Sequence, residues 1–150
     1  MDKRLRQIMI VLATIGLLVS IYMTVYKFTK IEAMCIGSGG CSTVNGSRYS
    51  EINGIPVAVL GILGYATLLV LLFLEKRPGF FQDNATMLIF GVSLLGFLFT
   101  LYLIYVEVAL IGAYCPFCLT SQAVMTIIFI ISVIRLARQP QLEEDLNAPH

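Results

Sequence analysis

Four cysteines are the most reactive residues of this 150-residue chain, and they form two pairs along the sequence. Cys35 and Cys41 are separated by five residues, three of them glycine, whereas Cys115 and Cys118 belong to a Cys-Pro-Phe-Cys motif. Paired thiols exchange with disulfides and thereby accept or donate two electrons. Four cysteines allow three connectivities, of which the sequence favours Cys35–Cys41 together with Cys115–Cys118 at rest.

The motif Cys115-Pro116-Phe117-Cys118 is the more specific sequence signal of the two pairs. Proline suits the first position of a helix, because its missing N–H has no intrahelical partner there and its φ is already helical. We therefore expect Cys115 to be the N-cap of a helix and Cys118 to lie in its first turn. The partial positive charge at a helix start favours a thiolate, which is the species that attacks disulfides.

The loop pair, Cys35 and Cys41, closes a small glycine-rich ring that is expected to be mobile. Such a ring could bring one sulfur to a partner and the other to the Cys-x-x-Cys motif. Two alternatives use the same residues: a pair of static disulfides, or a four-cysteine zinc site. Because an oxidising compartment would oxidise these thiols first, and because the one histidine, His150, is the last residue, no metal site is predicted.

The elements that position these cysteines are expected to cross a membrane. Hydrophobic residues make up 58% of the chain and charged residues 13%, which lies outside the range of soluble domains. Four uncharged stretches are long enough to cross a hydrocarbon core as helices: 8–26, 55–74, 85–106 and 115–134. The sequence thus predicts an all-α integral membrane bundle of four helices, forming a single domain over 1–150. A formal charge of +1 gives no basic surface for nucleic acid.

The basic residues predict the topology. Seven lie on the side of the predicted spans that holds both termini, and three lie on the other side. The first side is therefore expected to be cytoplasmic, with a solvated, frayed tail at 135–150. The outer side of the inner (plasma) membrane would hold all four cysteines and the loop 27–54, in which 42–52 is expected to form a short lid.

Glu107 is the one carboxylate close to the interior of a predicted span. Ionisable residues within spans are commonly functional, so Glu107 is a candidate for proton transfer or for orienting the loop; from its place near the outer end it could equally reach the membrane interface. A small transporter built around Glu107 is the alternative function from a different class. Four glycines within the spans are expected at close helix contacts: Gly61, Gly64, Gly91 and Gly96.

With four spans, a Cys-x5-Cys loop after the first and Cys-x-x-Cys opening the fourth, the chain resembles the vitamin K epoxide reductase family, and more specifically its bacterial, stand-alone members. The resemblance covers 8–135 and includes further segments: Cys41–Tyr49 with Ser47, Asn53–Pro56 with Gly61 and Tyr65, and Tyr102–Glu107. The DsbB-type quinone-linked oxidases carry their Cys-x-x-Cys motif in the first outer loop, so the order of the two pairs is reversed there.

The resemblance implies a role for each cysteine. Cys118 would donate electrons to a bound quinone, Cys41 would attack Cys115, and Cys35 would exchange with a reduced partner. Ser47 would hold or polarise a quinone oxygen. An apolar quinone is expected to bind within the bundle near the outer helix ends, with these candidates on the pocket wall: Pro56, Val57, Leu60, Gly61, Phe117 and Gln122. At Gln122 the chain departs from the family pattern, which has a tyrosine.

The expected function is that of a quinone-linked thiol oxidase that supports disulfide formation. Electrons would pass from a separate, extracytoplasmic thioredoxin-like (DsbA-like) protein through the loop pair to the Cys-x-x-Cys pair. They would then reach a membrane quinone of the menaquinone, ubiquinone or phylloquinone type. Within the same chemistry, reduction of vitamin K quinone or its epoxide is the alternative physiological output.

Overall fold

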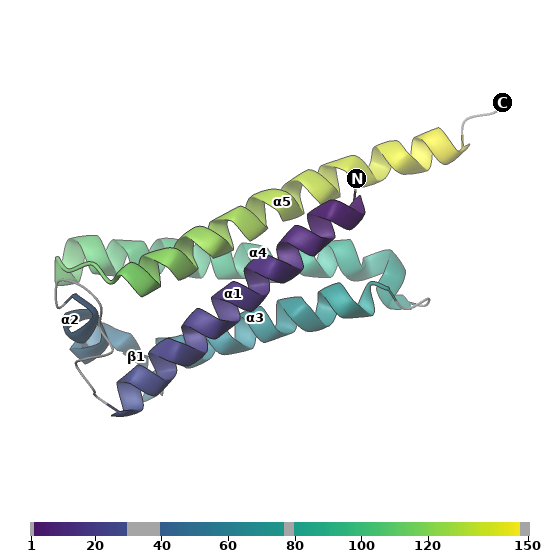
Figure 1. Cartoon of the computed structure of the whole chain (residues 1–150). Coiled ribbons are helices and arrows are strands. Elements are labelled where there is room, and N and C mark those ends of the chain that lie inside the picture. The colour runs from purple at the N-terminus through teal and green to yellow at the C-terminus, as the bar shows by residue number, and fades with distance from the viewer. Residues whose placement is uncertain (1, 30–39, 77–79, 148–150) are drawn as a thin grey trace.

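Four long helices make up most of the protein, as the computed structural model shows (Figure 1). It describes residues 2–29, 40–76 and 80–147 and, within them, the side chains of 3–29, 40, 42–76 and 84–138. The long helices are α1 (Asp2–Thr29), α3 (Val57–Leu74), α4 (Phe80–Tyr105) and α5 (Pro116–Asn147). Each is long and apolar enough to cross a membrane, so the prediction of an all-α membrane bundle is confirmed.

Few residues of the four long helices are buried inside the protein. At most 28% of the most apolar window of any span is buried inside the protein, and large apolar side chains such as Leu18, Leu95 and Met87 are exposed. In water such a surface would drive aggregation, whereas lipid solvates it. Inside, α1 packs against α3 and α5, and α4 packs against the same two helices. The bundle is therefore a closed ring of four helices.

The second span is predicted to begin at Ile55, whereas α3 begins at Val57, because the chain first makes a β-hairpin. Strands β1 (Glu51–Ile52) and β2 (Ile55–Pro56) pair antiparallel, with Ile52 opposite Ile55. The turn between them is Asn53-Gly54, and both residues have positive φ, of 52° and 81°. Asn-Gly is the usual sequence of such a turn, because these two residues tolerate the left-handed region.

The expectation of a frayed tail is wrong, because α5 runs on to Asn147. Figure 1 shows its C-terminal part projecting beyond the rest of the bundle. Gln, Leu and Glu, which make up five of the seven residues from 141 to 147, are good helix formers. The loss of one backbone hydrogen bond at Pro140 therefore does not end the helix.

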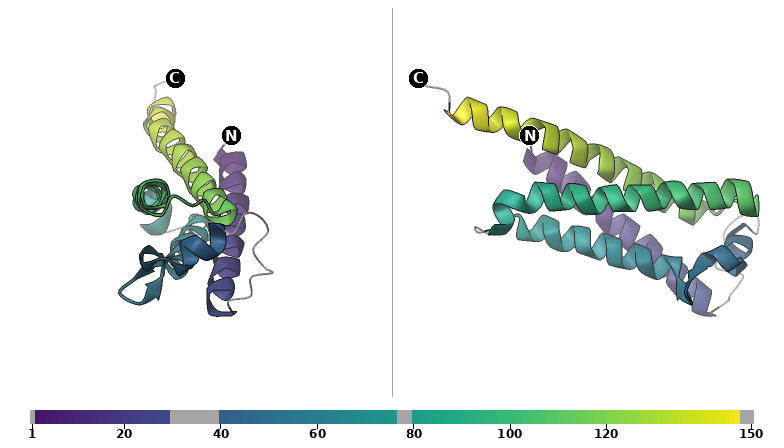
Figure 2. Two further views of the ribbon diagram at one scale, coloured as in Figure 1. Left: turned by 90° about the vertical axis from the view of Figure 1, so that its left-hand side faces the viewer. Right: turned by 180° about the vertical axis from the view of Figure 1, so that it is seen from behind.

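The two ends of the bundle differ in character (Figures 1 and 2). At one end lie both termini and the connection between α3 and α4, where buried Arg135 of α5 pairs with Glu75. At the other end lie the start of α5 and the predicted lid, which is built from α2 (Gly40–Gly46), the 3-10 turn η2 (Arg48–Ser50) and the hairpin. The short lid helix predicted between the first two spans is thus present. Which end faces the cytoplasm stays a prediction.

Candidate functional site

The Cys-x-x-Cys motif opens α5 in the way its proline predicts. Helix α5 begins at Pro116, and the N–H of Leu119 donates to the carbonyl of Cys115 at 3.0 Å. This is the first hydrogen bond of the helix, so Cys115 is the N-cap and Cys118 lies in the first turn. The placement of both sulfurs at a helix N-terminus is confirmed.

The two cysteines of the motif have different surroundings. Cys115 is fully buried and packs in an apolar cluster with Met23 and Tyr26 of α1 and Val44 of α2. Cys118 is partly exposed, packs beside the same cluster and lines an internal cavity of the bundle. Cys115 is therefore enclosed between α1 and the lid, whereas Cys118 opens on the cavity.

A glycine brings the lid against the chain segment that carries Cys115. Gly40, the first residue of α2, lies so close to Tyr114 that a Cβ atom on Gly40 would be 2.0 Å from the Tyr114 carbonyl oxygen. Gly40 precedes Cys41 and Tyr114 precedes Cys115. This contact between Gly40 and Tyr114 thus places the segment that begins with Gly40 and Cys41 directly beside Cys115, the N-cap of α5.

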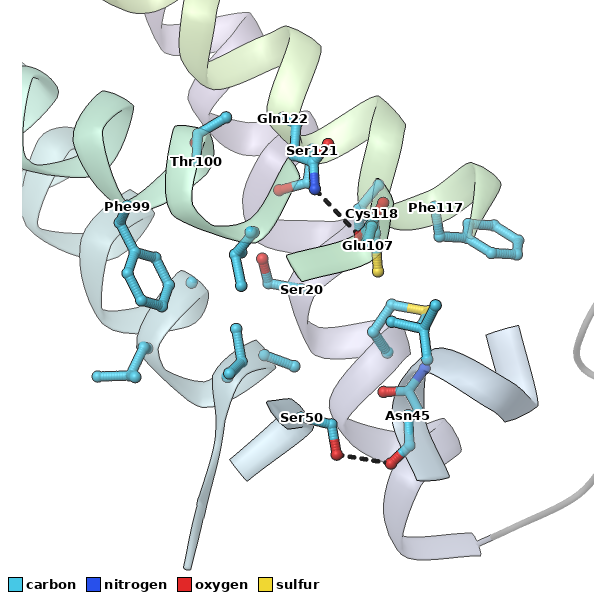
Figure 3. Close-up of a pocket in the computed structure, with 18 of the residues that line it drawn as sticks. Ser20, Asn45, Ser50, Phe99, Thr100, Glu107, Phe117, Cys118, Ser121 and Gln122 are labelled. Atoms are coloured by element: carbon cyan, nitrogen blue, oxygen red, sulfur yellow. Dashed lines mark hydrogen bonds between the residues drawn. The ribbon is translucent and has the colours of Figure 1, made fainter. Parts of the chain in front are cut away.

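The cavity lies between the buried clusters of the two ends of the bundle. It has about 1030 Å³ of empty space, its open side included, and its walls hold Tyr65 and Met125 from one cluster and Met23 and Val44 from the other. Figure 3 shows Cys118, Glu107, Ser121 and Gln122 on one side of this space and Phe99 and the lid residue Ser50 on others. The lining is largely apolar, as is usual for sites that bind organic molecules.

Five residues predicted as quinone contacts all line this cavity: Ser47, Val57, Leu60, Phe117 and Gln122. Gly61 lines it as well, whereas Pro56 does not and instead lines a separate outer groove. The Phe117 ring packs on Tyr22 of α1, with centroids 5.0 Å apart. The role of the five predicted residues as quinone contacts stays a prediction. Cys35 lies outside the described residues and Cys41 is described by its backbone alone, so the pairing of the loop cysteines is also a prediction.

Sequence reasoning missed the contribution of α4 to the cavity. Phe99, Thr100 and Leu103 form part of its wall, and in the sequence two of them are ordinary apolar residues of an apolar span. The one available signal was Thr100, a polar residue at mid-span, which is 5% exposed and donates to the Gly96 carbonyl at 2.9 Å.

The lid is attached to α1 by a lysine. Lys27 Nζ donates to the Ser50 hydroxyl and carbonyl and forms an ion pair with Glu51 at 3.1 Å. The Ser47 hydroxyl, predicted to hold a quinone oxygen, donates to the Val44 carbonyl at 2.7 Å. Its proton is therefore used within the lid, and the Ser47 hydroxyl would have to rotate in order to donate to a ligand.

Helices α3 and α5 are tied together at the cavity wall by Tyr65. Its hydroxyl donates to the Ser121 carbonyl at 2.8 Å, and its ring occupies the space beside Gly16, where a Cβ atom would be 2.3 Å from the ring. The predicted close contacts of Gly61 and Gly96 are also present, against Ser20 and Met125. Gly64 and Gly91, by contrast, have open space at the Cβ position, so that part of the prediction is wrong.

Glu107 points into the protein and not toward the outside of the bundle. The end of the third span is a π-helix, Val106–Ile111, in which the N–H of Gly112 donates to the Glu107 carbonyl at 2.8 Å. Gly112 ends this turn with a φ of 66°, a conformation that favours glycine. Glu107 is 4% exposed and lines the cavity beside Cys118. The alternative of a transporter built around Glu107 stays a prediction.

The protein thus holds a Cys-x-x-Cys pair at a helix start, between a lid and an internal cavity, within a bundle of apolar helices. The family model described as the Vitamin K epoxide reductase family matches residues 7–133, and the chain belongs to this family. It is also 31% identical over 118 residues to a protein of Arabidopsis thaliana named thiol-disulfide oxidoreductase LTO1. That match covers 75% of this chain and 31% of the relative, so the chain spans about a third of the relative's length.

Proposed function

We propose that this protein is a quinone-linked disulfide oxidase, in which electrons pass from a thiol partner through Cys35 and Cys41 to Cys115 and Cys118 and then to a membrane quinone. The observation that carries the proposal is the division between the two sulfurs of the motif. Cys115 is buried against the lid and Cys118 lines the cavity. Membership of the family and the name of the Arabidopsis relative support thiol–disulfide chemistry.

The cavity fits a quinone in polarity and chemistry. Its lining is largely apolar, as is usual for ligand pockets, and Val57, Leu60 and Phe99 would pack against the ring. Its polar groups include Glu107 and Gln122, which adjoin Cys118, and the lid residues Asn45, Ser47 and Ser50. When bound there, a quinone supplies an acceptor for two electrons and two protons.

In this proposal, residues of the chain itself carry the electrons as far as Cys118, which donates them to the quinone. Helix α5 stabilises a thiolate at its N-terminus through its dipole. The Gly40–Tyr114 contact keeps the Cys41 segment beside Cys115, so that a Cys41 thiolate can attack the Cys115 sulfur of a Cys115–Cys118 disulfide. This attack forms the Cys41–Cys115 bond and leaves Cys118 as a thiolate. Attack by Cys118 in return would run the exchange backwards, whereas attack by Cys35 on Cys41 completes reduction of the motif.

The thiol partner is proposed to be a thioredoxin-like protein that meets Cys35 on the outer face of a plasma membrane. The basic residues support this topology, because in the sequence seven of ten flank the spans on the side opposite the loop that holds the lid. An outer location is also where disulfides persist.

Mixed-disulfide trapping is expected to identify the cysteine that meets the partner. In a Cys41→Ala protein the disulfide between Cys35 and the partner cannot be resolved, so a covalent complex should accumulate on a non-reducing gel. A Cys35→Ala protein, which retains the same number of cysteines, should accumulate none. If Cys35→Ala traps the partner and Cys41→Ala does not, the order of the loop pair is the reverse of that proposed.

Filling the cavity at Gly64 is expected to raise the quinone concentration needed for half-maximal rate by about tenfold, since a one-methylene change in a pocket is worth about 10–200-fold and a bulkier side chain excludes the ring. Gly64 lines the cavity and has no atom within 4 Å of its Cβ position, so Gly64→Leu points its side chain into open space. The measurement is the rate of quinone reduction by reduced protein at several quinone concentrations.

Gly91→Leu is the matched control, because Gly91 also has open space at the Cβ position but does not line the cavity. It should reduce quinone as the wild type does. Equal behaviour of the Gly64 and Gly91 variants would show that quinone binds elsewhere.

A further inference from the structure

Glu107 and Gln122 form a buried polar pair beside the reactive cysteines (Figure 3). They are 4% and 5% exposed, and Nε2 of Gln122 donates to Oε1 of Glu107 at 3.1 Å. The Cys118 side chain lies within hydrogen-bonding reach of the same carboxylate, and Cys115 is near enough to interact with its charge. The pair thus contacts the atoms that react in the thiol–disulfide step.

Local backbone structure is what turns Glu107 toward the sulfurs. The π-helix Val106–Ile111 places an extra residue in the last turn of the span, and such insertions are frequent at functional sites. Within this turn Val106 and Glu107 are buried, whereas Val108 and Leu110 are exposed. The one acidic residue of the turn therefore faces inward, while Val108 and Leu110 face the outside of the bundle.

Two acceptor atoms of the pair are buried without a hydrogen-bond partner among the described residues. They are Oε2 of Glu107 and Oε1 of Gln122. Burial of an acceptor without a donor is unfavourable. A proton on Oε2 removes this deficit, because the resulting carboxylic acid can donate. The surroundings of Glu107 are thus suited to a carboxyl group that binds and releases a proton during turnover.

We propose that Glu107 is the proton acceptor of the Cys115/Cys118 dithiol and that Gln122 positions its carboxylate. In this step the carboxylate takes the proton of the Cys118 thiol, which breaks the S–H bond and leaves a thiolate. Oxidation of the dithiol then forms one S–S bond, breaks two S–H bonds in all and releases two electrons and two protons. The proposed quinone acceptor takes up both, and Glu107 passes thiol protons toward the cavity. The inference therefore rests on the proposed quinone-linked function.

The proposal gives a role to Gln122, the position at which the chain departs from the family's tyrosine. Its amide can donate to Glu107 and still present a carbonyl oxygen to a protonated Oε2. Other titratable groups of the same cavity come from α1, the lid and α3: Lys27, Tyr49 and Tyr65. Lys27 is held by Ser50 and Glu51 and Tyr65 by Ser121, so Glu107 is the carboxylate of the cavity wall that adjoins the sulfurs.

The test uses the full chain in detergent and two readouts. The first is alkylation of Cys118 by iodoacetamide in reduced, quinone-free protein over a range of pH, followed by mass spectrometry. A thiol and a carboxylate that share a proton titrate in two macroscopic steps, so the wild type should show a two-step profile and Glu107→Gln a single step. The second readout is quinone reduction, which Glu107→Gln should slow about 100-fold, as is typical when an acid–base group is lost.

Glu107→Gln keeps an amide that can pair with Gln122, so it tests the proton and not the packing. The exchanged pair Glu107→Gln/Gln122→Glu returns one carboxylate to the site, and it should recover the two-step profile together with about tenfold of the rate. Ser93→Ala is the control, since Ser93 is a buried hydroxyl of α4 that does not line the cavity; it should match the wild type in both readouts.

A Glu107→Gln protein that keeps the two-step profile overturns the proposal, even if its activity falls, because the loss is then structural. Wild-type quinone reduction by Glu107→Gln overturns it as well. A Cys118→Ser protein that reduces quinone at the wild-type rate would contradict the proposed quinone-linked function. In that case the alkylation profiles of Cys118 in the wild type and in Glu107→Gln would still decide the role of Glu107.

Discussion

Replacement of Cys118 by serine is expected to stop quinone reduction, with a loss of about 1000-fold or more, as for removal of other reacting nucleophiles. Cys118 is the sulfur that lines the cavity, and a hydroxyl can neither form a disulfide nor give up its electrons in this way. Serine differs from cysteine by a single atom, so the bundle should unfold at an unchanged temperature. The measurement is the change in quinone absorbance after addition of quinone to reduced protein.

The same variant tests the order of the two sulfurs without any quinone. In Cys118→Ser the Cys115 thiolate can attack Cys41 of a Cys35–Cys41 disulfide, but the released Cys35 can reverse this step, so Cys35 is replaced as well. In Cys35→Ser/Cys118→Ser treated with a mild oxidant, peptide mapping should find a Cys41–Cys115 bond. In Cys35→Ser/Cys115→Ser no corresponding bond to Cys41 should accumulate, because the remaining sulfur opens on the cavity. Accumulation of a Cys41–Cys118 bond instead would mean that the assignment of the two cysteines must be exchanged.

Replacement of Gly40 by alanine is expected to slow electron transfer between the two cysteine pairs by about 100-fold, which is the effect of a misplacement of about 1 Å on a reacting geometry. The new Cβ would lie 2.0 Å from the carbonyl oxygen and 2.9 Å from the carbonyl carbon of Tyr114. Both are backbone atoms, so no side chain can rotate away, and α2 must move off the segment that leads to Cys115.

Single-turnover kinetics separate this effect from damage to the quinone site. Fully reduced protein holds two dithiols, and each can reduce one quinone. In Gly40→Ala the first equivalent should be reduced at the wild-type rate, because Cys115 and Cys118 react directly, whereas the second equivalent should appear slowly. A Gly40→Ala protein in which both equivalents appear at the wild-type rate would show that the lid contact has no part in the transfer.

Gly46→Ala is the matched control for this experiment. Gly46 ends the same short helix, yet it has nothing within 4 Å of its Cβ position. Alanine there should change neither phase. If both glycine variants slow the second phase equally, the cause is the conformation of α2 itself and not its contact with Tyr114.

Local features of the sequence predicted local features of the structure well. Pro116 after Cys115 predicted the start of α5, since helix capping depends on a few adjacent residues, and Leu119 donates to Cys115 as expected. The Asn53-Gly54 turn was recognisable as a turn, although the hairpin it makes, which delays α3 to Val57, was not predicted. Charge-free length was enough to find the four spans.

The inward faces of the helices could not be read from the sequence. The spans are apolar around their whole circumference, so no periodic pattern separates residues that face lipid from those that face the cavity. Phe99 and Leu103 line the cavity, while Leu98 and Leu101 on the same helix are exposed. For the same reason Gly64 and Gly91 looked like contact glycines, although each adjoins open space.

By itself, then, the sequence determined which residues are candidates for the chemistry, on how many spans they are held and that Cys115 and Cys118 share a helix start, because each of these depends on neighbours along the chain. Only the tertiary structure decided that Cys115 is enclosed beside the lid while Cys118 opens on the cavity, and that Glu107 is buried against Gln122. These relations join residues from different helices, and they depend on how the helices rotate and pack against one another, which apolar spans do not encode in their periodicity.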